Sequence, residues 1–202
     1  MKKCTLICGY KPIIKKEYEG DLFGIDKGAL YLIENNFDNF ISLGDFDSVS
    51  DDEYNLIKKH SKEIIKLNPI KDDTDLEHAL KYIKEKGYDT LDIYGSIGGR
   101  QDHNLLNLKL IYLSDLNITA YSDKDKIFNL KKGRHVINKN GYTYLSLFTF
   151  ENCLINLTGT FYPIETKLVT IEDNYTTSNE ILKDSCNLDI LDGRLLVIQS
   201  KD

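Results

Sequence analysis

The most informative acidic residues stand in the segment ISLGDFDSVSDDE, residues 41–53, where they follow a short apolar run. Asp45 and Asp47 stand two positions apart, so an extended backbone would point both carboxylates to the same side. Such a pair can share one hard cation, and Mg²⁺ is typically held by one or two carboxylates together with waters and substrate phosphates. The alternative is that these residues only form a turn and cap a helix over residues 51–61. Their position after a buried-looking strand favours a magnesium site.

A second acidic group, KDDTD at residues 71–75, precedes an amphipathic segment. Thr74 and Glu77 fit a capping box, and acidic residues in a first turn suit the helix dipole. One cap and one acid would satisfy the helix, so the excess predicts that Asp72 and Asp75 face the same place as the first acidic pair. Clustered carboxylates raise one another's pKa unless a cation lies between them, so the cluster itself predicts a metal ion.

A glycine-rich turn, in YGSIGGRQDH at residues 94–103, follows a further strand-like run. Gly98 and Gly99 permit close approach of the backbone, the amides that open the next helix favour an anion, and Arg100 can bind phosphate oxygens with two hydrogen bonds. The turn predicts a phosphate site, with a packing role for the glycines as the alternative. The three groups together indicate magnesium-assisted phosphoryl chemistry on a nucleotide, although neither GxxxxGK[ST] nor GxGxxG occurs in the chain.

Two kinds of element must position these residues. Apolar runs bounded by Gly, Asp or Asn predict strands at residues 4–9, 22–26, 39–45, 63–68, 90–96 and 117–123. Helix faces are predicted by Leu76, Ala79, Leu80 and Ile83, and again by Leu106, Leu110 and Leu113. The alternation predicts an α/β fold: a mostly parallel, Rossmann-like sheet with flanking helices, which binds ligands at the carboxyl ends of its strands.

From about residue 125 the pattern changes to closely spaced strand-like runs without helical periodicity. Asn140-Gly141 and Asp192-Gly193 each stand between apolar runs and predict tight hairpins. We therefore expect two domains, an α/β domain over residues 1–124 and a smaller antiparallel β-sandwich over residues 125–202.

Composition and the lengths of the apolar runs argue against nucleic-acid and membrane partners. The chain has 26 Lys and Arg residues against 32 Asp and Glu residues, a net charge of −6, which disfavours nucleic-acid binding. No apolar run reaches the roughly 20 residues that span a bilayer, and the opening MKKCTLICGY is too quickly polar for a signal peptide. No CxxC pair occurs among Cys4, Cys8, Cys153 and Cys186, so we expect reduced core cysteines in a cytoplasmic protein without a membrane partner.

Five motifs, in order, resemble those of the thiamine pyrophosphokinase (thiamine diphosphokinase) family, and the resemblance spans about residues 24–180. They are GDFDS at 44–48, DDTD at 72–75, GGRQDH at 98–103, GTFYP at 159–163 and SNE at 178–180. The resemblance implies a catalytic α/β domain, a thiamine-binding β domain, and transfer of the diphosphate of ATP to the thiamine hydroxyl, which gives thiamine diphosphate and AMP. It also implies Mg²⁺ and a homodimer with its active site at the subunit interface.

The resemblance also implies roles for individual residues. Asp45, Asp47, Asp72, Asp75 and Asp102 would be catalytic, and Asp45, Asp47 and Asp75 would hold the metal. Contacts to ATP would come from Asp26, Ser48, Thr74, Gly98, Gly99 and Arg100, and contacts to thiamine from Asp102, Tyr162, Ser178 and Asn179. An aromatic face at Tyr162 would attract the thiazolium cation, although packing of Tyr162, and turn formation by Ser178 and Asn179, are the alternatives.

One departure from the family pattern leaves other functions open. Where many relatives read ADGGA, residues 25–29 read IDKGA, which keeps Asp26 and replaces the first glycine by Lys27. A magnesium-dependent nucleotide hydrolase would need no second domain, and a non-catalytic thiamine or nucleotide sensor would keep the pocket without turnover. The catalytic base is not evident from the sequence, and we expect His103 to orient Asp102 or a backbone group by a hydrogen bond.

Overall fold

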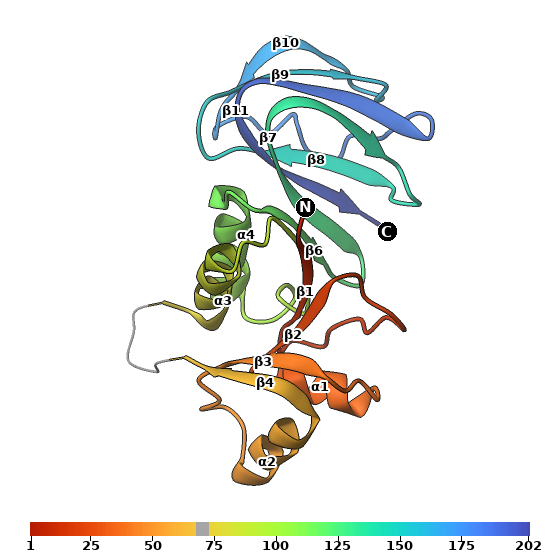
Figure 1. Ribbon diagram of the computed structural model, residues 1–202. Helices are drawn as coiled ribbons and strands as arrows, with labels where there is room; N and C mark the ends of the chain where they lie inside the picture. Colours follow the sequence, from red (N-terminus) through yellow and green to blue (C-terminus); the bar gives the residue numbers. More distant parts are fainter. Residues whose placement is uncertain (68–72) are drawn as a thin grey trace. The chain divides into compact units, whose positions relative to one another are not determined.

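The apolar runs of the first part of the chain form strands, as predicted, in the computed structural model, which describes residues 1–67 and 73–202. The chain divides into two compact units (Figure 1). Unit 1 is Met1–Leu110 with Asp115–Asp123, and unit 2 is Ile111–Ser114 with Lys124–Asp202. Among the described residues, no helix has both the length and the apolar character needed to cross a membrane.

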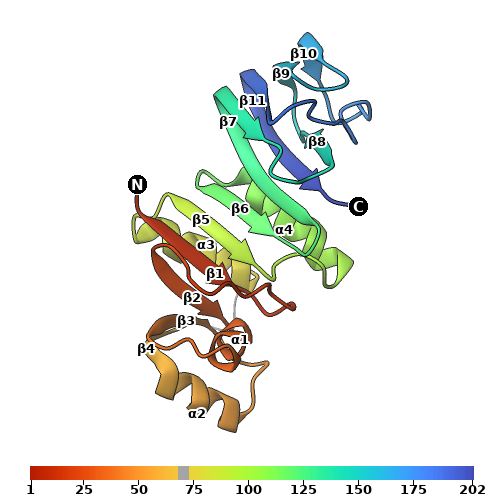
Figure 2. The ribbon, with the colours of Figure 1, turned by 90° about the vertical axis from the view of Figure 1, so that its right-hand side faces the viewer.

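Unit 1 contains a parallel sheet. Its strands are β1 (Lys3–Ile7), β2 (Asp21–Ile25), β3 (Phe40–Gly44), β4 (Ser61–Lys66), β5 (Thr90–Tyr94) and β6 (Asn117–Tyr121). They lie side by side in the order β6-β5-β1-β2-β3-β4 (Figure 2), and every pair is parallel. The chain builds the sheet outward from β1 to β4 and then returns to the other side of β1 with β5. The strand order therefore reverses between β1 and β5, the point where open α/β sheets bind ligands.

Helices cover both faces of this sheet, as the sequence predicts. They are α1 (Gly28–Glu34), α2 (Asp51–His60), α3 (Asp75–Glu85) and α4 (Gln101–Leu113). The predicted apolar face of α3 is confirmed, because its four members, Leu76, Ala79, Leu80 and Ile83, are all buried. Figures 1 and 2 show α3 and α4 on one face of the sheet and α1 on the other.

The predicted face of α4 is not the fully buried one, because Leu106 and Leu110 are only half-buried, although the helix itself is confirmed. Leu113 is 53% exposed, and the buried positions are Asn107, Ile111 and Tyr112. Leucines recur at residues 105, 106, 108, 110 and 113, and at about 100° per residue they spread over more than half of the helix circumference. Such a pattern has no single apolar face, and the tertiary packing selects which side is buried.

The capping box predicted for α3 is also wrong. Thr74 occupies the N-cap position, but its side chain makes no capping hydrogen bond. Glu77 pairs instead with Lys81, at 3.0 Å between Oε1 and Nζ. A capping box does form at α2, where the Ser50 and Glu53 side chains each bond the other residue's backbone N–H.

Unit 2 is antiparallel, which confirms the predicted change of architecture. Its strands are β7 (Asp125–Asn138), β8 (Tyr144–Phe148), β9 (Cys153–Thr158), β10 (Ile164–Val169) and β11 (Ser185–Ser200). β11 is central: β7 pairs along its whole length on one side, while β9 and β8 pair with its first and second halves on the other. Side chains from all of these strands form one apolar core. All four cysteines of the chain are buried and free, as predicted.

The hairpin predicted at Asp192-Gly193 is wrong. Both residues lie inside the single long strand β11, at a break in register between Ile190 and Arg194. The segments on either side continue along the same partner, β7, so the extra residues make a bulge that bends the strand instead of reversing it. Gly193 has φ +84°, a conformation that favours glycine.

Asn140-Gly141 does form a tight turn, with φ of +46° and +78° and a 2.9 Å hydrogen bond from the Tyr142 N–H to the Lys139 carbonyl. The turn does not close a hairpin, because its flanking strands are not paired with each other. Leu196 of β11 pairs with Asn129 of β7 and with Phe148 of β8, so β11 lies between the two strands.

Candidate active site

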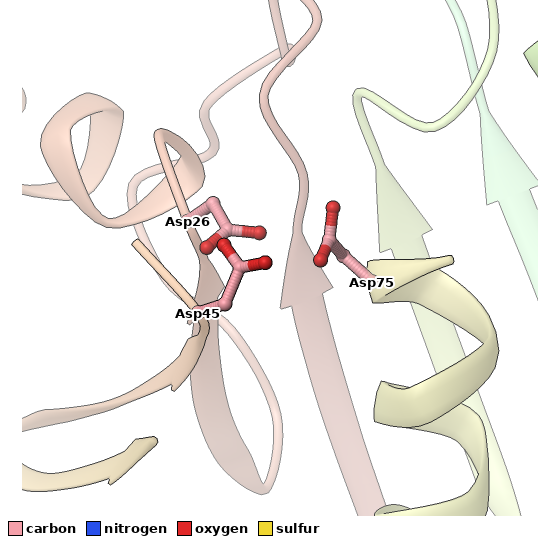
Figure 3. A group of neighbouring side chains, drawn as sticks. All are labelled: Asp26, Asp45 and Asp75. Carbon is pink, nitrogen blue, oxygen red and sulfur yellow. The ribbon is translucent and has the colours of Figure 1, made fainter. Parts of the chain in front are cut away.

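Three carboxylates converge at the carboxyl ends of neighbouring strands in unit 1. Asp26 follows β2, Asp45 follows β3, and Asp75 is the first residue of α3. Each offers an oxygen within 4.8 Å of the oxygens of the other two, and Figure 3 shows the three side chains directed toward one another. We call these residues the acidic triad.

Glycine and an unusual backbone conformation make this convergence possible. A Cβ at Gly44 would lie 1.9 Å from the Asp26 Oδ1, so only glycine leaves room for that carboxylate. The next turn is left-handed at Phe46, with φ +60°, and the Phe46 N–H donates to the Asp26 Oδ1 at 3.0 Å. The GDFDS segment therefore holds Asp26 as well as presenting its own acids.

The electrostatics of the acidic triad call for a cation. Burial, together with the charge of the nearby Asp75, raises the pKa of Asp26 to about 7. Burial also raises the pKa of Asp75, together with the charges of Asp45 and Asp47. Within the described residues, no Lys, Arg or His side chain forms an ion pair with any member of the acidic triad. Three carboxylates without a counter-charge fit a hard divalent cation.

The acidic triad differs from the predicted metal set of Asp45, Asp47 and Asp75, because Asp26 stands where Asp47 was expected. The expectation assumed an extended backbone from Asp45 to Asp47, and the left-handed φ of Phe46 contradicts it. The Asp47 N–H instead donates to the Asp45 Oδ1 at 3.0 Å, which holds the Asp45 carboxylate in place. Asp72 lies outside the described residues.

A cavity of about 360 Å³ adjoins the acidic triad where the strand order reverses, a volume within the range of small-molecule sites. The predicted residues that line it are Asp26, Asp47, Ser48, Thr74, Asp75, Gly99 and Arg100, and Lys27 lines it as well. Its remaining walls come from the end of β2, from the turns after β1 and β5, and from α3 and α4.

The glycine turn after β5 has a packing role as well as a place at the cavity. A Cβ at Gly98 would lie 2.6 Å from the Tyr10 ring, and one at Gly99 would lie 3.0 Å from it. The Gly98 N–H donates to the Asn104 Oδ1 at 2.9 Å. Both glycines therefore have the packing role that was the alternative to phosphate binding. Of the two, Gly99 alone lines the cavity.

Arg100 lines the cavity, but its guanidinium binds Asp102 through two hydrogen bonds, Nε to Oδ1 at 3.1 Å and Nη2 to Oδ2 at 2.5 Å. Asp102 raises the pKa of Arg100, and Arg100 lowers that of Asp102. The His103 backbone N–H also donates to the Asp102 Oδ1, at 3.0 Å. Asp102 is not among the residues that line the cavity.

Sequence reasoning missed Ser96, which lines the same cavity and is the second residue after β5. Ser96 is 7% exposed, and its hydroxyl has no hydrogen-bond partner among the described residues. The Asn107 amide, also buried, donates to the Ser96 carbonyl at 2.7 Å. A buried hydroxyl without a partner is costly, so it indicates a contact with a ligand or water. The available signal was its place at the carboxyl end of a predicted strand.

Replacing Ser96 with alanine is expected to weaken binding of the nucleotide that the acidic and glycine motifs predict, about two- to tenfold, the equivalent of one hydrogen bond of about 0.5–1.5 kcal/mol. The melting temperature should stay unchanged, because the hydroxyl bonds no described residue. Calorimetric titration with a nucleoside triphosphate will check this. An unchanged Kd would show that Ser96 makes no contact with the nucleotide.

In unit 2, the structure brings Tyr162 and Asn179 together. Tyr162 is 63% exposed, and its ring packs edge-on against Phe161 at 4.9 Å between centroids. The Asn179 side chain is buried and hydrogen-bonds the backbone of Tyr162. Ser178 has φ +55°, and its N–H donates to the Ser146 hydroxyl at 3.0 Å. A surface cavity of about 300 Å³ is lined by Tyr162, Pro163, Ile164, Glu165, Lys167 and Tyr175.

Comparisons with known proteins give one consistent result. Residues 21–122 match the family model of the thiamin pyrophosphokinase catalytic domain. The chain is 30% identical to the thiamine pyrophosphokinase of Bacillus subtilis over 185 residues, which are 89% of this chain and 86% of that protein. The crystal structure of the B. subtilis enzyme matches with a TM-score of 0.88 at 27% identity, over all of both chains. A thiamin pyrophosphokinase family protein from Enterococcus faecalis matches at 0.87 and 25%, also over all of both chains.

Proposed function

This chain belongs to the thiamin pyrophosphokinase family, and from that we propose that the acidic triad and its cavity form the site where ATP reacts. The protein is a thiamine pyrophosphokinase: it transfers the diphosphate of ATP to the hydroxyl of thiamine, which gives thiamine diphosphate and AMP. The observation that carries the placement of the site is the convergence of three uncompensated carboxylates beside a cavity of about 360 Å³.

We propose that Mg²⁺ is the cation held by Asp26, Asp45 and Asp75. Their oxygen-only donor set and the close approach of their carboxylates support this choice. When bound, Mg²⁺ would neutralise charge on the phosphate oxygens of ATP. Asp47 lines the cavity beside the acidic triad, where it can add negative charge at the metal site. Asp72 belongs to the same proposal from its motif, although it lies outside the described residues.

The phosphates of ATP would be held by Ser48, Thr74, the turn at residues 98–99 and Arg100. The Arg100 guanidinium donates two hydrogen bonds to Asp102, so contact with phosphate requires the guanidinium to exchange that partner. The ion pair is exposed, with side chains 73% and 61% accessible, so the exchange costs little. Asp102 would then be free to contact thiamine.

We further propose that residues 1–124 carry catalysis and residues 125–202 bind thiamine. The chain would work as a homodimer in which both subunits contribute to each active site, as the family resemblance implies. A cytoplasmic location is supported by the four buried free cysteines, which suit a reducing compartment.

The Tyr162 ring is proposed to face the thiazolium cation of thiamine. Tyr162→Ala is therefore expected to raise KM for thiamine about three- to thirtyfold, the range of a cation–π contact of about 0.5–2 kcal/mol, with KM for ATP unchanged. Tyr162→Phe is the matched control and should stay near the parent value, because it keeps the ring. If the alanine variant retains the parent KM for thiamine, the ring does not bind the substrate.

The reaction itself is tested by incubating the protein with ATP, Mg²⁺ and thiamine and separating the products. AMP and thiamine diphosphate should appear in equal amounts. ADP would indicate transfer of the terminal phosphate alone, and AMP formed without thiamine would indicate a nucleotide hydrolase. Binding of both ligands by calorimetry without product would indicate a sensor.

A further inference from the structure

Asn179 is a polar side chain in an unusual position, because it is only 3% exposed while the residue that it contacts, Tyr162, is 63% exposed. Its amide bonds both backbone polar groups of Tyr162. The Tyr162 N–H donates to the Asn179 Oδ1 at 3.0 Å, and the Asn179 Nδ2 donates to the Tyr162 carbonyl at 2.7 Å. The two residues are 17 positions apart, so these bonds tie together separate segments of the chain.

The amide has little capacity left for a ligand. Its oxygen also accepts the Glu180 N–H at 2.9 Å, so both lone pairs of Oδ1 are used by backbone donors. The orientation of the amide follows from these contacts, because a flipped amide would point its NH₂ group at two N–H donors. At most one N–H of Asn179 remains for another partner. The predicted direct contact with thiamine is therefore a poor fit to this side chain.

Further hydrogen bonds hold both Tyr162 and Asn179 in place. The hydroxyl of Thr160, which is also buried, donates to the Tyr162 carbonyl at 3.2 Å. The Asn179 backbone exchanges hydrogen bonds of 2.7 Å and 3.0 Å with Leu145 of β8. Tyr162 stands in the connection between β9 and β10. Asn179 thus links this exposed connection to a strand of the core.

We propose that Asn179 is a positioning residue for Tyr162: it fixes the backbone of Tyr162 so that the exposed ring stands ready for its substrate. The inference rests on the proposed thiamine contact of Tyr162. Without the Asn179 amide, the segment between β9 and β10 would sample other conformations, and thiamine binding would have to order that segment. The free energy needed for this ordering would weaken thiamine binding. It would leave kcat unchanged, because other residues form the proposed site of phosphoryl transfer.

Asn179→Ala is expected to raise KM for thiamine about tenfold while kcat and KM for ATP stay within about twofold. In a Tyr162→Ala background the same change should raise KM for thiamine less than about twofold, because there is no ring left to position. Asn179→Asp keeps the two acceptor bonds but places an oxygen, in place of the donor, against the Tyr162 carbonyl, which repels it. It should raise KM for thiamine at least as much as alanine does, and it serves as the test variant if the alanine variant does not fold.

Amide hydrogen exchange tests the inference without relying on catalysis. Exchange at the Tyr162 N–H, measured by NMR, should accelerate at least about tenfold in Asn179→Ala. Unchanged exchange would overturn the inference. So would an equal rise of KM in the parent and Tyr162→Ala backgrounds, because Asn179 would then contact thiamine directly. If Tyr162→Ala leaves KM for thiamine unchanged, the proposed thiamine contact fails, while the exchange rate still decides whether Asn179 holds the Tyr162 backbone.

Discussion

Asp45→Asn is expected to lower kcat at least about a hundredfold without unfolding the protein. Asp45 follows β3 and offers one of the three oxygens that lie within 4.8 Å of one another. Removing its charge weakens the hold on the cation and loses several kcal/mol of transition-state stabilisation, and about 1.4 kcal/mol corresponds to a factor of ten in rate. The measurement is the rate of AMP formation at saturating ATP, Mg²⁺ and thiamine, with circular dichroism to confirm the fold.

The matched control for this variant is Asp52→Asn. Asp52 is also an aspartate that follows β3, but it is exposed in the first turn of α2 and is not a member of the acidic triad. The same loss of one charge there should leave kcat within about twofold. Near-parent activity of Asp45→Asn would remove Asp45 from the catalytic site.

Asp26→Asn is expected to change activity and stability in opposite directions. Its kcat should fall by a factor comparable to that of Asp45→Asn, because both side chains belong to the acidic triad. The metal-free protein should nevertheless become more stable at pH 8. Burial and the neighbouring Asp75 raise the pKa of Asp26 to about 7, so the folded protein carries an unfavourable buried charge above that pH. An asparagine at this position carries no charge and can still accept the Phe46 N–H.

The sign of this stability effect follows from the two pKa values of Asp26. The ordinary value, 3.8, applies to the unfolded chain, and the folded value is about 7. Between these values the folded state holds a proton that the unfolded state has released, so the contribution of Asp26 to the free energy of unfolding falls as the pH rises. Above about pH 7 the contribution of Asp26 to the free energy of unfolding has reached its lowest value and no longer changes with pH. Metal-free Asp26→Asn should therefore exceed the parent most at pH 8, by a margin that shrinks toward pH 4.

Urea denaturation in the presence of a chelator, at pH 5 and at pH 8, measures this difference. Addition of Mg²⁺ should reverse the order at pH 8, since only the parent gains the full stabilisation from binding the cation. Asp52→Asn is again the control and should follow the parent at both values of pH. Equal stability of metal-free parent and Asp26→Asn at pH 8 would show that Asp26 is not destabilised by its surroundings.

Local patterns in the sequence were sufficient for most of the secondary structure. The strands of unit 1 and the apolar face of α3 follow from periodicity and from the glycines and polar residues that end each run, because these signals depend on a few neighbouring residues. The same signals did not reveal that β11 continues through Asp192-Gly193. A bulge and a hairpin turn share the same residue types, and the difference lies in whether the next segment pairs with β7 or with its own predecessor.

The chemistry of the candidate site is readable from the sequence in outline, because acids and glycines at successive strand ends must meet at one edge of a parallel sheet. The sequence does not reveal which three residues form the acidic triad. Asp26 joins Asp45 and Asp75 because Phe46 turns left-handed and Gly44 leaves space for a carboxylate that follows β2, and both conditions depend on the packing of two strands.

The sequence by itself thus determined the fold class, the acidic motifs and the family resemblance, since each resides in residue types at fixed spacing. Only the tertiary structure decided which carboxylates face one another and which side of α4 is buried. It also decided that Ser96 lines the cavity while its hydroxyl has no partner among residues 1–67 and 73–202, and that the Asn179 amide hydrogen-bonds the backbone of Tyr162. These facts depend on distances between atoms far apart in the chain, which spacing along the sequence does not encode.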